Sequence, residues 1–149
     1  MHVTIDGYGG DPVRLADEEL VRDLLDRYPS EIGMTKIAPP HVLRYVGAKP
    51  EDWGVSGFVL IAESHISVHT FPERGYVWVD IFSCKEFEAD LAIEGIRDSF
   101  GLERFETNTL DRGLLEYPHE VPGAAVVADE ERRQVARGMY ATAGRGRSG

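Results

Sequence analysis

Two short segments with strict two-residue alternation, separated by a turn, dominate the middle of this 149-residue chain. In residues 65–70 and again in residues 76–82, every second side chain is apolar, which is the period of a β-strand with one buried face. Between them, residues 71–75 include a proline and a glycine, which favour a tight turn. The pattern predicts an antiparallel hairpin with one core face and one face of polar and aromatic groups. The predicted core face carries Ile66, Val68, Val77, Val79 and Ile81.

The spacing of apolar residues elsewhere predicts helices and further strands around this hairpin. Asp17 is expected to cap the first helix, Pro29 to lie just past its end, and Gly101 to stop the second helix. Residues 57–62 are almost wholly apolar and are expected to form a buried strand. The predicted helices are 17–28 and 87–100, and the other predicted strands are 2–8, 41–46 and 104–110.

This order of elements predicts an α+β fold, a two-layer sandwich with helices on one face of a mostly antiparallel sheet. Two helices cover only one sheet face, so the other face is expected to pair with a second copy in a four-layer αββα dimer. The composition changes near residue 117. We therefore expect one domain over residues 1–117 and a partly disordered extension over 118–149, with a short helix over 129–140.

The charge balance excludes some classes of partner. The net charge is −10, which argues against a nucleic-acid backbone as ligand. No apolar run is long enough to span a bilayer, so no membrane partner is expected. A lone cysteine, Cys84, excludes an intrachain disulfide and fits a cytoplasmic location. No metal site is expected.

The polar residues of the central region are candidates for catalysis. A pyridoxal phosphate enzyme would need a lysine and a phosphate cradle to hold its cofactor. This chain has few lysines and no glycine-rich phosphate loop at a strand–helix junction. The run Glu63, Ser64, His65, with Ser56 and His69 on either side and Cys84 after the hairpin, closely resembles the core of the prokaryotic S-adenosylmethionine decarboxylases. The resemblance is strongest over residues 54–84.

The resemblance implies a self-processing proenzyme of polyamine (spermidine) synthesis. Cleavage between Glu63 and Ser64 would convert Ser64 into a covalent pyruvoyl cofactor, with which the substrate amine forms a Schiff base. Ser56 would donate a hydrogen bond during processing and His69 would act as acid or base. Cys84 would return a proton to the substrate after CO2 leaves.

The resemblance also implies a substrate contact from Glu73, supplied by the partner subunit of a homodimer, with Phe71 nearby. This part of the chain departs from the common family pattern. Phe71 stands where tryptophan is usual, Arg74 where an aromatic residue is common, and the loop before Gly54 carries Trp53 and extra acids. Two alternatives to S-adenosylmethionine decarboxylation therefore stay open: a pyruvoyl-dependent arginine or ornithine decarboxylase, and a non-catalytic homologue that never cleaves.

Overall fold

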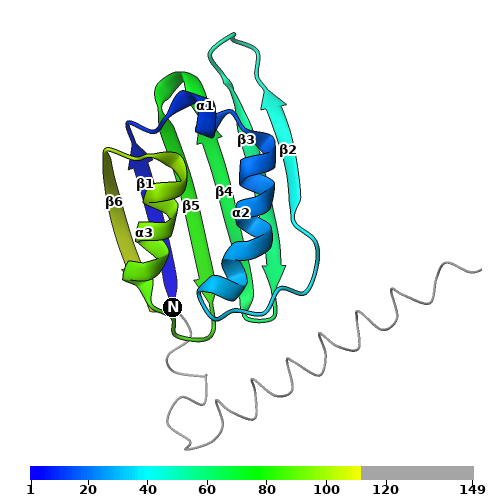
Figure 1. Ribbon diagram of the computed structural model, residues 1–149, viewed down its shortest axis with the longest axis vertical. Helices are drawn as coiled ribbons and strands as arrows, with labels where there is room; N and C mark the ends of the chain where they lie inside the picture. Colours follow the sequence, from blue (N-terminus) through cyan, green and yellow to red (C-terminus); the bar gives the residue numbers. More distant parts are fainter. Residues whose placement is uncertain (112–149) are drawn as a thin grey trace, which may run out of the picture.

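A computed structural model describes residues 1–111, which form one six-stranded sheet with helices on one face (Figure 1). Neighbouring strands are all antiparallel, in the order β2-β3-β4-β5-β1-β6. The strands are β1 (His2–Tyr8), β2 (His41–Val46), β3 (Trp53–Ile61), β4 (Ser64–Phe71), β5 (Tyr76–Ser83) and β6 (Arg104–Leu110). The α+β class and the antiparallel sheet are thereby confirmed. The end of the expected domain, its extension over 118–149 and the helix expected over 129–140 lie outside the described residues.

Two helices, α2 (Glu18–Glu31) and α3 (Ala89–Phe100), cover one face of the sheet (Figure 1). The short helices α1 (Pro12–Leu15) and η1 (Pro72–Arg74) lie near one end of the strands. Sequence patterning missed α1, which Asp11 caps by accepting from the main-chain N–H groups of residues 13 and 14. The core between helices and sheet includes Val3, Ile5, Leu15, Val21, Leu25, Val55, Val59, Ile66, Val68, Val79, Ile81, Ile96 and Phe100.

Local signals account for most of the helix boundaries. The Asp17 side chain accepts from the N–H groups of residues 19 and 20, which confirms it as the N-cap of α2. Gly101 ends α3 in the left-handed conformation, with φ of 63°. The expectation that α2 ends before Pro29 is wrong, because the helix continues to Glu31. Pro29 lies in the last turn, where it removes one helical hydrogen bond, and its buried ring packs with the core.

The sheet face away from α2 and α3, here called the open face, is rich in apolar side chains. The strand expected to be buried over 57–62 is buried on alternate residues only: Val59 is inaccessible, while Phe58 and Leu60 are 44% and 43% exposed. The pleat of β3 explains the error, because successive side chains point to opposite faces and only one face is covered. Large apolar residues exposed on the open face are Leu43, Tyr45, Phe58, Leu60, Tyr76 and Trp78.

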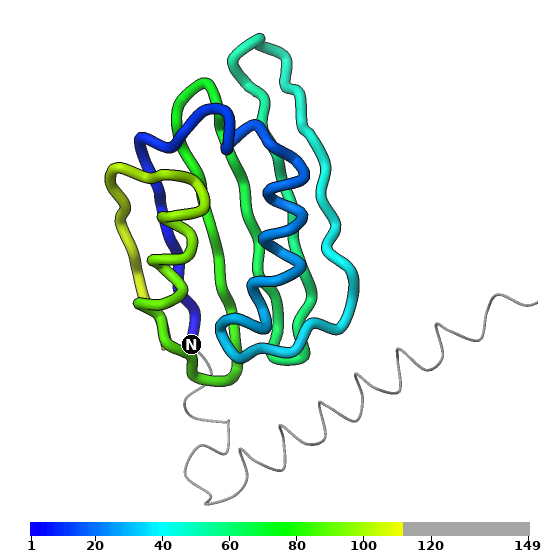
Figure 2. Tube along the Cα trace, viewed as in Figure 1, coloured from blue at the N-terminus to red at the C-terminus, as the bar shows by residue number. Residues whose placement is uncertain are grey.

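One end of the sheet gathers segments that are distant in sequence. The N-terminus, the chain after α2 and the β3–β4 turn lie together there (Figure 2). The Met1 ammonium donates to the Ser83 main-chain oxygen at 2.6 Å, which ties the N-terminus to the end of β5. This end, with the β3–β4 turn and Cys84, is called the cleavage end below. The opposite end, around η1, is called the pocket end.

Candidate active site

Ser64 is the first residue of β4, directly after the tight turn that joins β3 to β4. Its φ is 156°, the single positive value at a non-glycine residue within 1–111. Such backbone is sparsely populated by residues with a side chain and costs on the order of 1–3 kcal/mol. The structure therefore holds the backbone of Ser64, directly after the Glu63–Ser64 peptide bond, in an unfavourable conformation.

The carbonyl that Ser64 would attack already accepts a hydrogen bond. The main-chain N–H of Cys84 donates to the main-chain oxygen of Glu63 at 3.0 Å. Because Ser64 pairs with Ser83 in the β4–β5 ladder, Cys84 follows directly at the end of that ladder. An N–H aimed at this oxygen stabilises the negative charge that develops during attack. The Ser64 hydroxyl itself lies 3.2 Å from Nδ1 of His65.

The side chain of Glu63 is buried, with 3% of its surface exposed. Oε2 accepts from the main-chain N–H of Thr35 at 3.0 Å. Oε1 has no hydrogen-bond partner within residues 1–111. Among the buried side-chain oxygen and nitrogen atoms of those residues, it alone lacks one. Backbone bonds also join this segment to the chain after α2, since Ala62 donates to Thr35 O at 2.8 Å and Ile37 donates to Leu60 O at 3.1 Å. The Glu63–Ser64 peptide, where cleavage is predicted, is thus fixed through both its main chain and the Glu63 side chain.

Cys84 lies just after β5 with a half-buried, free thiol. Its neighbour Ser83 is fully buried, and the Ser83 hydroxyl donates to Lys85 O at 2.7 Å. This bend turns the chain away from the ladder and leaves the Cys84 N–H on the Glu63 carbonyl. The structure therefore brings Cys84, Glu63 and Ser64 together at the cleavage end.

Ser56 and His69 are brought together, but not with Ser64. They face each other across the β3–β4 ladder, and the Ser56 hydroxyl lies 2.9 Å from Nδ1 of His69. His69 is five positions beyond Ser64 on the same strand, which separates the two residues by about 17 Å. Within one chain, the pair expected to assist processing is out of reach of the bond that would be cleaved.

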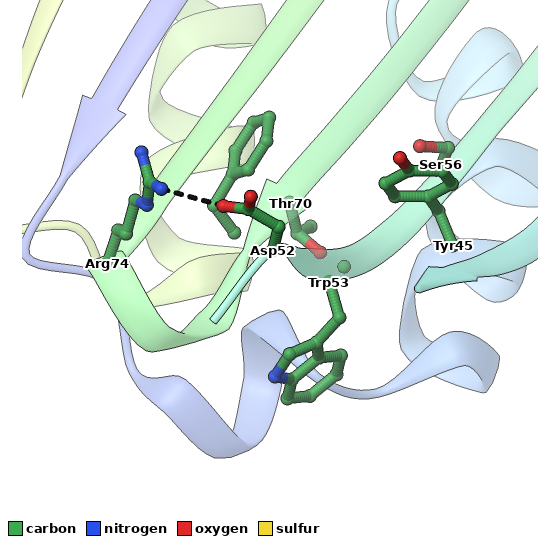
Figure 3. A pocket seen from close by; sticks show the side chains of 8 residues that line it. Tyr45, Asp52, Trp53, Ser56, Thr70 and Arg74 are labelled. Atoms are coloured by element: carbon green, nitrogen blue, oxygen red, sulfur yellow. Dashed lines mark hydrogen bonds and ion pairs between the residues drawn. The ribbon is translucent and has the colours of Figure 1, made fainter. Parts of the chain in front are cut away.

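A cavity of about 220 Å³ opens beside this pair at the pocket end (Figure 3). Arg74 and Asp52 form an ion pair across it, with Nη2 and Oδ1 2.8 Å apart. The cavity therefore holds two of the residues predicted from the sequence, Ser56 and Phe71, next to residues that were not predicted. Its lining consists of Tyr45, Asp52, Trp53, Gly54, Ser56, Thr70, Phe71 and Arg74.

Trp53 connects this cavity to Glu73. Its indole Nε1–H donates to Oε1 of Glu73 at 3.1 Å. The Arg44 guanidinium lies 4.1 Å from the centre of the Trp53 ring, a cation–π contact that orients the indole. Sequence analysis treated Trp53 as a departure from a family pattern and assigned it no role. The signal in the sequence that could have indicated a role for Trp53 is its position in a loop next to acidic residues.

Comparison with known proteins identifies the family. The family model described as S-adenosylmethionine decarboxylase matches residues 1–113. This chain belongs to that family. It is 31% identical over 116 residues to the S-adenosylmethionine decarboxylase proenzyme of Pyrococcus furiosus, covering 77% of this chain and 79% of the relative. It is 33% identical over 135 residues to the proenzyme of Parasynechococcus marenigrum, covering 90% and 94% of the two chains.

A solved structure of the family has the same fold. The crystal structure of the adenosylmethionine decarboxylase from Aquifex aeolicus matches with a TM-score of 0.66 at 31% identity, covering 81% of this chain and 94% of the other. The predicted membership of the decarboxylase family is confirmed, and with it the prediction of an enzyme. Within residues 1–111, no helix is long and apolar enough to cross a membrane.

Proposed function

We propose that this chain is a self-processing S-adenosylmethionine decarboxylase whose cofactor is a pyruvoyl group made from Ser64. The observation that carries the proposal is the geometry of the Glu63–Ser64 peptide. Its serine has a positive φ, and its carbonyl oxygen already accepts the Cys84 N–H at 3.0 Å. Strain and a ready oxyanion donor are two of the properties that self-cleavage requires.

The residues at the cleavage end take part in two steps, the processing of the precursor and the decarboxylation of the substrate. When formed, a pyruvoyl group supplies a carbonyl that withdraws electrons from the substrate as CO2 leaves. The Cys84 thiol then donates a proton to the substrate carbon that lost CO2. Its main-chain N–H serves the earlier processing step, so one residue contributes to both. The product would be the aminopropyl donor of spermidine synthesis, and the enzyme would work in the cytoplasm.

The site is proposed to be completed by a second copy of the chain. Ser56 and His69 lie about 17 Å from Ser64 along β4, and Glu73 lies beyond them in η1. A two-fold arrangement of facing sheets would bring the pocket end of one chain to the cleavage end of the other. The exposed apolar side chains of the open face, including Phe58, Leu60 and Trp78, support such a homodimer. In it, Ser56 and His69 assist cleavage at the partner's Ser64, and Phe71 and Glu73 contact the substrate bound there.

The pocket end is compatible with a cationic nucleoside substrate. Arg74 places a positive charge near the proposed sulfonium, but Asp52 pairs with it at 2.8 Å and offsets that charge. Phe71 and Trp78 stack edge-to-face with centroids 4.5 Å apart, which gives a sulfonium an aromatic surface. Glu73 has a second carboxylate oxygen for a ribose diol, since Trp53 occupies Oε1.

Two measurements test this function. Intact mass should show two fragments, residues 1–63 and a chain that starts with pyruvoyl at position 64. CO2 release should then be compared for S-adenosylmethionine, arginine and ornithine on the processed protein. A single intact mass that hydroxylamine does not change would refute self-processing. An amino acid favoured tenfold in kcat/KM, about 1.4 kcal/mol, would replace the substrate but keep the cofactor.

A further inference from the structure

The buried carboxylate of Glu63 has no assigned task beyond its place before the scissile bond. Burying a charged group is costly unless partners compensate for it. Here only half of the group is compensated: Oε2 accepts the Thr35 N–H at 3.0 Å, and Oε1 has no hydrogen-bond partner in the part of the chain described. Such an atom is retained at a cost to the folded precursor. Because Glu63 directly precedes Ser64 in the chain, a positive charge formed at Ser64 is a candidate partner for this oxygen.

Self-cleavage creates a new charged group at that place. Ser64 Oγ attacks the carbonyl carbon of Glu63, the Oγ–C bond forms and the C–N bond breaks, while the hydroxyl proton passes to the nitrogen. An ester and a primary amine on Ser64 result. The amine then takes one proton from solvent and becomes an ammonium. The precursor contains an amide nitrogen at this atom, so the positive charge exists only after the shift.

We propose that the Glu63 carboxylate is a positioning and electrostatic residue for this N-to-O acyl shift, with Oε1 held ready for the Ser64 ammonium. The inference rests on the proposed self-processing and adds a residue to it. The Thr35 N–H fixes one oxygen of the carboxylate, and the Thr35–Ala62 backbone bond of 2.8 Å fixes the segment. The other oxygen gains a partner when the amine appears. A penalty in the precursor is thereby relieved in the ester, which shifts the amide–ester equilibrium toward cleavage.

The alternative is a purely structural role, in which the carboxylate only anchors residues 62–64 to Thr35. The two roles make opposite predictions for Glu63→Gln. The amide oxygen of glutamine still accepts the Thr35 N–H, but the side chain carries no charge. Neutralising a half-compensated buried charge should leave the precursor as stable as before or more stable. If the role is purely structural, the variant should process at about the natural rate. Under our proposal, the same variant should process more slowly.

The experiment uses full-length chains made by cell-free translation and followed from synthesis, so that the precursor is seen before it cleaves. Glu63→Gln should process at least tenfold more slowly than the natural chain. The fraction of precursor that hydroxylamine traps as ester should fall, and the melting temperature should be equal or higher. Glu63→Asp keeps the charge and should process faster than Glu63→Gln. Glu86→Gln makes the same chemical change at an exposed acid close to Cys84, and should process at the natural rate.

Processing of Glu63→Gln within twofold of the natural rate would overturn the inference. A parallel fall in processing and melting temperature would overturn it too, since that result indicates an anchor and not a charge. If Glu63→Gln does not fold, Glu63→Asp is the deciding variant, because it keeps the negative charge. A Glu63→Asp chain that does not process at all would refute the role of charge. A natural chain that never cleaves in the same translation would refute the proposed function itself, which separates the two failures.

Discussion

The two ends of the sheet are built in different ways. At the cleavage end, the reactive groups are buried or half-buried, and backbone hydrogen bonds fix them: Cys84 to Glu63, and Ala62 to Thr35. At the pocket end, exposed side chains hold one another, through the Arg74–Asp52 ion pair and the Trp53–Glu73 hydrogen bond. The first end is proposed to form the cofactor, and the second is proposed to assist cleavage in the partner chain and to bind the substrate.

This difference indicates which end of the sheet can exchange its residues without loss of the fold and which end cannot. Side-chain contacts between exposed groups contribute little to folding, so a chain can exchange them without losing its structure. Backbone bonds around a strained peptide depend on the strand register, and that register depends on the core. The departures from the family pattern noted in the sequence, Trp53 and Arg74, accordingly lie at the pocket end.

The largest effect is expected from Ser64→Ala. Without the hydroxyl there is no nucleophile for the Glu63 carbonyl, so cleavage and decarboxylation should both be lost completely. Mass spectrometry of the purified protein should show one intact chain. Ser67→Ala removes a hydroxyl from the same strand and should still cleave. Two fragments from Ser64→Ala would show that the chain is cleaved at another bond, and would refute the proposed cleavage between Glu63 and Ser64.

Cys84→Ala should separate the two tasks that we propose for Cys84. Alanine keeps the main-chain N–H that bonds to the Glu63 carbonyl, so processing should continue near the natural rate. Loss of the thiol removes the proposed proton donor, and turnover should fall by about a hundredfold. Protonation at the wrong carbon should also inactivate the cofactor during turnover. Timed CO2 release on fully processed protein measures both effects. Full activity with full lifetime would reduce Cys84 to a packing residue.

The sequence predicted the strands closely, because alternation in β4 and β5 records which side chains face the core. It failed where main-chain groups decide the geometry. Every non-proline residue has a main-chain N–H. The sequence therefore does not show that the N–H of Thr35 bonds to the Glu63 side chain, or that the N–H of Cys84 bonds to the Glu63 carbonyl. Resemblance named Ser56 and His69 together with Ser64, but a list of positions does not show that a length of β4 separates them.

Trp53→Phe tests the pocket end. Phenylalanine keeps an aromatic ring under Arg44 but lacks the N–H that holds Glu73. Losing one hydrogen bond to a carboxylate costs about 1 kcal/mol, so KM for S-adenosylmethionine should rise about fivefold. Both kcat and processing should change little, because Trp53 bonds to Glu73, which is proposed to bind the substrate, and not to Ser56 or His69.

Two further variants decide whether Trp53 acts through Glu73. In a double-mutant cycle, Trp53→Phe should add almost nothing to Glu73→Gln if the indole works by holding that carboxylate. Arg44→Gln leaves the N–H in place and should affect KM less than Trp53→Phe. Additive effects of Trp53→Phe and Glu73→Gln, or slower processing in Trp53→Phe, would show that Trp53 does not act through Glu73.

The smallest effect is expected from Tyr28→Phe, which belongs to neither end. The Tyr28 hydroxyl is buried and donates to the Ala92 main-chain oxygen, joining α2 to α3. Its loss should lower the free energy of unfolding by about 1 kcal/mol and leave processing and KM unchanged. Burial, and to a lesser degree Glu31, raise the pKa of Tyr28 well above its ordinary value of 10.0. The folded state therefore holds this proton more tightly than the unfolded state, so the contribution is complete below pH 10 and is lost as the pH rises above it. Denaturant titrations at neutral and alkaline pH should show the stability difference between the natural chain and Tyr28→Phe shrinking above about pH 10. A difference that stays constant would mean that Tyr28 contributes through packing alone.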